Sequence, residues 1–89
     1  FVAANDAIAS GILRACRDRK LRIPEDVAIT GFDDVETAIT ARPTLTTLHV
    51  PKEEMGALAV RLLAQLIAGS ASAGTKIVVP VQLVPREST

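Results

Sequence analysis

Three polar side chains in this chain stand where an open α/β sheet binds its ligands. Asp33 and Asp34 come shortly after the apolar run Val27–Thr30, and Asn5 follows the apolar run Phe1–Ala4. Such ligands bind just beyond the carboxyl ends of parallel strands. An ionised carboxylate only accepts hydrogen bonds whereas an amide also donates, so the set suits a vicinal diol or another polyhydroxylated group. Turns and helix N-caps favour the same residue types and are the alternative explanation.

A strand, a helix and a second strand must position these side chains. The apolar spacing of Ile8, Ile12, Leu13 and Cys16 predicts a helix from Asp6 to about residue 19, between strands over 1–4 and 27–30. Parallel neighbouring strands place residues 5 and 33 at one edge of the sheet.

Two glycines have a predicted purpose in this βαβ unit. Gly31 follows the second strand, where a glycine lets the backbone turn sharply. Gly11 lies inside the predicted helix at a propensity cost of roughly 1 kcal/mol against alanine. The cost indicates that another element comes close to Gly11.

The rest of the chain continues the alternation of strands and helices. The patterns predict a helical turn over Val35–Ala41, a strand over Thr44–Val50 and a helix from Pro51 to Gly69. Lys76–Val84 contains Pro80 and reads as an edge strand or two short pieces, and the tail 85–89 is expected at the surface. The helix from Pro51 is the clearest amphipathic one, with an apolar face formed by Met55, Leu58, Ala59, Leu62, Leu63, Leu66 and Ile67.

Composition excludes several classes of function. Ten basic and ten acidic residues, two phenylalanines and no tyrosine or tryptophan offer neither a basic field nor a stacking platform for nucleic acid. Cys16 is the single cysteine, so no disulfide forms within the chain. No apolar run has the ~20 residues that a membrane span needs. The chain begins at Phe1, inside a predicted strand, and we expect the natural N-terminus to lie upstream.

The residues for a complete catalytic or metal site are missing. His49 is the only histidine and is expected to be an ordinary strand residue, and no cysteine pair provides zinc ligands. Neither a serine nucleophile elbow nor a dinucleotide fingerprint occurs. Asp33 and Asp34 on a magnesium ion remain the enzymatic alternative. We therefore predict no enzyme, no catalytic residue, no cofactor and no metal.

Six short motifs together resemble the lactose-repressor and galactose-repressor (LacI/GalR) family of bacterial transcription regulators. They occur in that family's order and spacing over nearly the whole chain: Ala4-Asn5-Asp6-Ala7, Arg22-Ile23-Pro24-Glu25-Asp26-Val27, Gly31-Phe32-Asp33-Asp34, Arg42-Pro43-Thr44-Leu45-Thr46-Thr47, Pro51-Lys52-Glu53-Glu54-Met55-Gly56 and Leu83-Val84-Pro85-Arg86-Glu87-Ser88-Thr89. Each motif is weak by itself, but six in order are specific.

The resemblance implies an α/β fold: a fragment of the Rossmann-like, type I periplasmic-binding-protein fold, with a parallel sheet and flanking helices. Residues 1–89 would be the C-terminal portion of the effector-binding domain, with 1–49 and 76–89 in the C-terminal subdomain and 50–75 crossing into the N-terminal one. It further implies a cytoplasmic homodimer that senses a sugar or related polyol. Operator DNA would be bound only through a helix-turn-helix head that this chain lacks.

The family's effector site supplies expectations for single residues. In sugar-responsive members, residues matching Asn5 and Asp33 contact effector hydroxyls, whereas Asp34 supports the turn. Phe32 and Val50 are expected to line the cleft. The family frequently has a glutamine in place of Val50, so a sugar phosphate or another highly polar effector fits this chain less well, unless valine packs on an apolar ligand face.

The family's dimer interface would include part of the first helix and the segment after the two aspartates. The matching residues are Ala7, Ile8, Gly11, Ile12, Val35 and Ile39. Packing within the chain is the alternative explanation for these small and apolar side chains. The apolar face of the helix from Pro51 would pack on a sheet outside this chain, so residues 1–89 by themselves should be unstable or self-associate.

An extracytoplasmic sugar-binding protein of the same fold is the main alternative to a regulator. A signal peptide upstream of Phe1 would support that alternative, whereas a helix-turn-helix would support the regulator.

Overall fold

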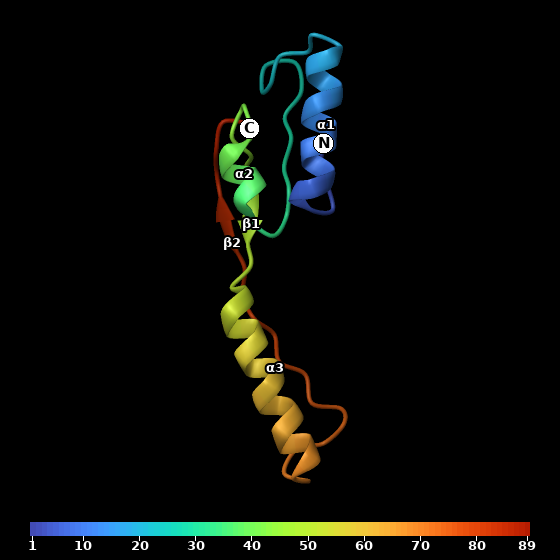
Figure 1. Ribbon diagram of the computed structural model, residues 1–89, viewed down its shortest axis with the longest axis vertical. Helices are drawn as coiled ribbons and strands as arrows, with labels where there is room; N and C mark the ends of the chain where they lie inside the picture. Colours follow the sequence, from blue (N-terminus) through green and yellow to red (C-terminus); the bar gives the residue numbers. More distant parts are fainter. The chain divides into compact units, whose positions relative to one another are not determined.

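The computed structural model describes residues 1–89, which form two units. The larger unit contains Phe1–Val50 and Val81–Thr89, and the smaller unit contains Pro51–Pro80. Along the chain the elements are α1 (Asp6–Asp18), α2 (Glu36–Thr40), β1 (Thr47–His49), α3 (Lys52–Ile67) and β2 (Gln82–Val84) (Figure 1).

Four segments lie side by side in the sheet of the larger unit. Parallel bridges join Val2 to Thr30, Thr30 to Thr46 and Asp33 to His49. β2 then pairs antiparallel with β1, with Leu48 opposite Leu83. The predicted α/β fold with parallel strands is confirmed, with one antiparallel strand added at its edge. In each of the strands expected over 1–4 and 27–30, one residue forms bridges, Val2 in the first and Thr30 in the second. Within 76–84 only Gln82–Val84 is a strand, and it begins after Pro80, which has no N–H to donate to a sheet.

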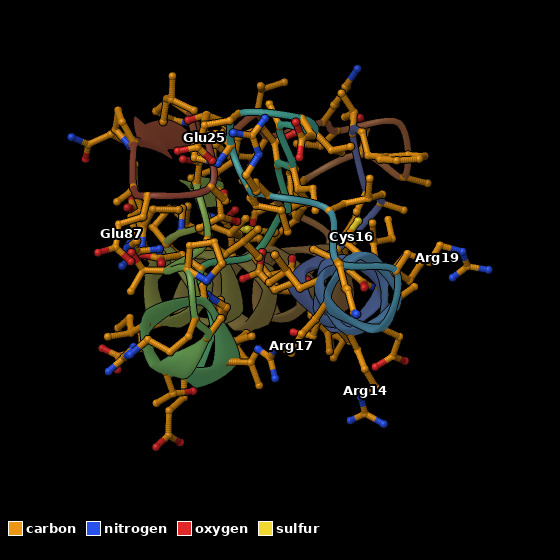
Figure 2. All side chains as sticks on the ribbon, turned by 90° about the horizontal axis from the view of Figure 1, so that it is seen from above. Arg14, Cys16, Arg17, Arg19, Glu25 and Glu87 are labelled. Carbon is orange, nitrogen blue, oxygen red and sulfur yellow. The ribbon has the colours of Figure 1, made fainter.

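α1 forms close to where the sequence predicts it, and most of its predicted apolar face is turned inward: Leu13 and Cys16 are buried, and Ile12 packs against the core. The Oδ1 atom of Asn5 accepts a hydrogen bond from the Ile8 N–H at 2.9 Å and caps the helix. The buried residues are Asp6, Ala9, Leu13 and Cys16. Ile8, expected on that face, is 50% exposed. Figure 2 shows Arg14 and Arg19 extending away from α1 into solvent.

The core of the larger unit lies between its sheet, α1 and α2. Ile29 and Leu45 are its largest fully buried apolar side chains, and Ala3, Leu13 and Ala38 pack around them. Burial of an isoleucine or leucine side chain contributes about 1.5–3 kcal/mol. This core fixes the position of the loop that carries Asp33.

Space, rather than backbone conformation, explains Gly31. A Cβ atom at this position would overlap Asp6 Oδ1 and lie 2.9 Å from Leu45 Cδ2. Positive φ angles occur instead at Asp33 (105°) and Asp34 (54°). The prediction for Gly11 is wrong within this chain, because no atom lies within 4 Å of a Cβ built there.

Pro85, Glu87 and Thr89 of the tail 85–89 are exposed, as expected, but Ser88 is built into the interior of the larger unit. The Ser88 hydroxyl accepts a hydrogen bond from the Thr46 N–H at 2.9 Å and donates one to the Ile29 carbonyl at 2.6 Å. Ser88 is completely buried. A polar side chain can be buried when, as at Ser88, it finds hydrogen-bond partners in the interior.

The smaller unit is α3 followed by a segment without regular structure. None of its residues is buried. Ile77 and Val79 lie over one side of α3 and enclose a hollow of about 210 Å³ with Met55, Leu58, Ala59 and Leu62. No helix in the chain combines the length and apolar character needed to cross a membrane.

Candidate functional site

The start of α1 and the loop after Thr30 meet at one edge of the sheet. The Asp6 N–H donates to the Phe32 carbonyl at 2.9 Å. Asn5 precedes the donor and Asp33 follows the acceptor, so the structure brings these two predicted residues together. Both side chains are partly exposed.

Asn5 combines a structural function with free polar capacity. Its Oδ1 atom caps α1. The amide NH2 group (Nδ2) of the same side chain can donate to a hydroxyl, and the capping hydrogen bond fixes the direction in which this group points. The N-cap and ligand interpretations of Asn5 are therefore compatible.

Asp33 is held by its backbone in an unusual conformation. Its N–H donates to the Leu48 carbonyl at 3.0 Å, in register with His49 of β1. Its φ of 105° is rare for any residue with a side chain. Such conformations persist only where the surrounding structure imposes them, and they concentrate at ligand-binding sites.

The Asp34 carboxylate is held by the Arg86 guanidinium and the His49 ring. Its Oδ1 atom lies 2.7 Å from Arg86 Nη2, and its Oδ2 atom lies 3.0 Å from His49 Nδ1. Burial alone would raise the pKa of Asp34, but the hydrogen bonds and charges of Arg86 and His49 outweigh it, so the pKa lies below its ordinary value. His49 is a β1 residue, as predicted.

Asp6 is a buried carboxylate that the sequence marked only as the start of the first helix. Its Oδ1 atom accepts from the Thr47 hydroxyl at 2.6 Å, and its Oδ2 atom accepts from the Val35 N–H at 2.9 Å. Asp6 therefore ties α1 to β1 and to the loop before α2. Sequence spacing holds no sign of these contacts, which join residues 29 and 41 positions apart.

The two expected cleft residues differ in exposure. Phe32 is partly exposed in the loop between Thr30 and Asp33, and Val50 is buried at the end of the larger unit. Phe32 is therefore the more accessible of the two to a ligand of the larger unit.

The six residues predicted for a dimer interface leave an apolar surface on α1 and near α2. Ala7 and Gly11 are exposed, Ile12 is partly exposed, and Ile39 is 58% exposed. Ile8 and Val35 are also exposed. Packing within this chain therefore does not account for most of these side chains.

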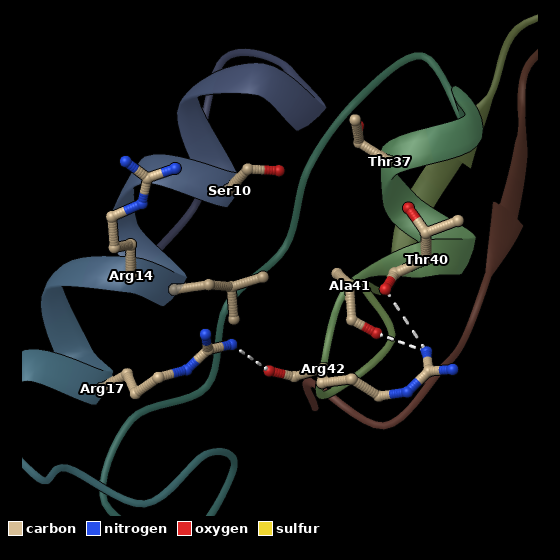
Figure 3. Close-up of a pocket in the computed structure, with 8 residues that line it drawn as sticks. Ser10, Arg14, Arg17, Thr37, Thr40, Ala41 and Arg42 are labelled. Atoms are coloured by element: carbon tan, nitrogen blue, oxygen red, sulfur yellow. Dashed lines mark hydrogen bonds between the residues drawn. The ribbon is translucent and has the colours of Figure 1, made fainter.

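A hollow of about 220 Å³ separates α1 from α2 (Figure 3). Neither Asn5 nor Asp33 lines it. An Arg17 guanidinium nitrogen donates to the Arg42 carbonyl at 3.0 Å across it. Arg42 itself donates to the Ala41 carbonyl at 2.8 Å, at the end of α2. These contacts join the two helices, and we find no complete ligand site among them.

Comparison with known proteins adds a family to this geometry. The family described as a periplasmic binding protein-like domain matches residues 1–89. The ribose operon repressor of Escherichia coli (strain K12) is 46% identical over 59 residues, which are 66% of this chain and 18% of the repressor.

Two solved structures of regulators match almost the whole chain. The transcriptional regulator CelR-cellobiose complex has a TM-score of 0.93 and 38% identity, covering 99% of this chain and 27% of that one. The lac repressor dimer bound to operator and the anti-inducer ONPF has a TM-score of 0.90 and 36% identity, covering 99% and 30%. The chain thus spans less than a third of the length of each of these three proteins.

Proposed function

This chain belongs to the periplasmic binding protein-like family, as part of the effector-binding domain of a LacI/GalR-type regulator, and we propose that it binds a sugar-like effector and mediates dimerisation. The relatives are transcriptional regulators, which are not enzymes. The proposed protein is a cytoplasmic regulator whose DNA-binding head lies outside these residues.

The meeting of residues 5 and 33 at one sheet edge carries the proposal. The hydrogen bond from the Asp6 N–H to the Phe32 carbonyl holds the two segments together. An amide donor beside a carboxylate acceptor matches the alternating donors and acceptors of neighbouring hydroxyl groups. Phe32 and Val50 would add apolar contact with the carbon face of a sugar ring.

Names of two relatives support a sugar as the effector class. One relative is a repressor of a ribose operon, and one structure is a complex with cellobiose. A neutral sugar also suits Val50, which offers no polar group to a phosphate.

We assign residues 1–49 and 76–89 to the C-terminal subdomain of the whole protein and 50–75 to the N-terminal one. The contact pattern supports most of this assignment, because Pro51–Pro80 makes a unit of its own, but it groups residues 76–80 with 51–75 rather than with 81–89. An effector bound between the subdomains would favour one of their relative orientations. It can shift that equilibrium only by its difference in affinity for the two states.

The dimer interface is assigned to the apolar surface formed by Ala7, Ile8, Gly11, Ile12, Val35 and Ile39. Its support is their exposure together with the open space at Gly11. A symmetric copy would cover this surface with the same residues. Through the dimer, a change of subdomain orientation would alter the spacing of two DNA-binding heads.

The magnesium alternative fits the site poorly. Asp34 already holds the Arg86 guanidinium at 2.7 Å and the His49 ring at 3.0 Å. A metal ion would have to displace these groups to use both aspartates.

The test is an Asp33→Ala substitution in the full-length protein that contains this chain. Hydrogen bonds to charged groups contribute about 1.5–3 kcal/mol, so sugar affinity should fall roughly 10- to 150-fold. This loss of affinity is measured by calorimetric titration with D-ribose, cellobiose and a panel of other neutral sugars. Asp26→Ala, on an exposed loop, is the control. Equal affinities of Asp33→Ala and the unsubstituted protein for the bound sugar would remove Asp33 from the site.

A further inference from the structure

We propose that Arg86 is a positioning residue for the effector: by holding Asp34, it fixes the backbone conformation that presents Asp33 to the ligand. The inference rests on the proposed function of Asp33. It gives the segment after β2 a role in binding, because Arg86 lies 53 positions after Asp33 in the chain.

Arg86 is fastened at three points of the larger unit. Its Nη2 atom donates to Asp34 Oδ1 at 2.7 Å, its Nη1 atom donates to the Leu45 carbonyl at 2.9 Å, and its backbone N–H donates to the Thr46 hydroxyl at 2.8 Å. The side chain is only 17% exposed. Arg86 is therefore a fixed support rather than a mobile surface charge.

The turn formed by Asp33 and Asp34 needs such a support because both residues have an unfavourable backbone conformation. Asp33 and Asp34 have successive positive φ angles of 105° and 54° without being glycines. A residue with a Cβ atom occupies this region at a cost, so the surroundings must hold it there. The Asp33 N–H to the Leu48 carbonyl holds one side of the turn, and the Asp34 carboxylate holds the other.

The shape of the guanidinium matters as well as its charge. Its two terminal nitrogens reach two acceptors at once, one on the turn and one on the strand segment at Leu45. A lysine ammonium is a single point of charge and does not reproduce a planar fork. His49 adds a second contact to Asp34 at 3.0 Å but is 47% exposed, so it is the weaker support.

The consequence for binding follows from geometry. If Asp34 loses Arg86, the turn relaxes and Asp33 no longer points in one direction. Binding groups must be held near their productive geometry to deliver their full interaction energy. Effector affinity should therefore fall although Arg86 does not touch the effector.

The first arm of the test measures affinity. The full-length protein with Arg86→Met or Arg86→Lys is titrated calorimetrically with D-ribose and cellobiose. We expect roughly tenfold weaker binding for Arg86→Met and a smaller loss for Arg86→Lys, by the magnitude of one charge-assisted contact. Arg22→Met, which breaks the surface ion pair between Arg22 and Asp26, should leave affinity unchanged.

The second arm separates positioning from a merely structural effect. In an Asp33→Ala background, Arg86→Met should weaken binding no further, because the group it positions is absent. An equal loss in both backgrounds overturns the proposal. Unchanged affinity for Asp33→Ala alone removes Asp33 from the site and with it the binding role of Arg86, and the third arm then decides only whether Arg86 holds the turn.

The third arm needs no ligand. NMR of the sugar-free protein should show faster amide exchange at Asp33 in Arg86→Met, with exchange at Leu13 in the core changed much less. Equal acceleration at both amides, or none at Asp33, contradicts the positioning role even if neither sugar binds. If Arg86→Met does not fold, the same comparison is made with Arg86→Lys.

Discussion

The two units of this chain differ in whether they bury an interior. Phe1–Val50 with Val81–Thr89 contains every buried side chain of the molecule, Ile29 and Leu45 among them. Pro51–Pro80 contains none, although α3 has the longest apolar face in the sequence. The larger unit is stabilised by its own contacts, while α3 presents an apolar face that its own unit covers only in part.

This difference shows that amphipathic periodicity predicts a helix but does not identify what covers it. Leu63 and Ile67 are 57% and 79% exposed, respectively. Burial of such side chains provides most of the stability of helices in proteins. In the full-length protein, we expect that a sheet outside these residues covers this face.

The most damaging substitution should be Asp6→Ala in the larger unit. It removes the acceptor of the Thr47 hydroxyl and the Val35 N–H from a fully buried position. Each of the two orphaned donors costs about 1–3 kcal/mol, so the free energy of unfolding of the full-length protein should fall by about 2–6 kcal/mol in urea denaturation. Asp18→Ala, at the exposed end of α1, is the control and should change it by less than about 0.5 kcal/mol. A loss below about 1 kcal/mol for Asp6→Ala would show that the larger unit does not depend on this carboxylate.

An intermediate effect is expected for Leu63→Ala in α3. If the apolar face is covered in the full-length protein, the substitution should cost about 2 kcal/mol there, in the range of buried leucines. Gln65→Ala on the same helix should cost less than about 0.5 kcal/mol.

Residues 1–89 alone should self-associate in sedimentation equilibrium. Cooperative unfolding of a monomer of residues 1–89 would contradict the contrast between the two units.

The smallest effect concerns the Arg22–Asp26 ion pair on the surface of the larger unit. Hydrogen bonds from the Arg22 side chain and backbone lower the pKa of Asp26 from 3.8 to about 2. Because the folded value is the lower one, the pair stabilises the fold above pH 3.8 and its contribution disappears as the pH falls toward 2. In carbon-detected NMR titrations, Arg22→Met should return the pKa of Asp26 toward its ordinary value, and Glu25→Gln should not. An ordinary pKa for Asp26 in the unsubstituted protein would exclude the ion pair.

Local signals in the sequence account for the parts of the fold that were predicted. Helix capping at Asn5, the spacing of Leu13 and Cys16, and Pro51 before α3 depend on neighbours a few positions away. The sequence also indicated that residues 5 and 33 would meet, because parallel strands align their carboxyl ends.

Contacts between distant residues could not be predicted in the same way. The burial of Ser88, the two partners of Asp6 and the Arg86–Asp34 pair each depend on where distant segments lie in the fold. Gly31 shows the same limit, because its requirement comes from Asp6 and Leu45 rather than from its own backbone.

The burial of Ser88 has a consequence for the order in which a ribosome makes this protein. Residues 1–50 emerge first, but Thr46 and Ile29 receive their partner only when Ser88 leaves the exit tunnel. All of 51–80 is translated in between. The larger unit therefore cannot complete its sheet until Ser88 has emerged, and the nascent chain keeps the Thr46 N–H and the Ile29 carbonyl without this partner while residues 51–80 are made.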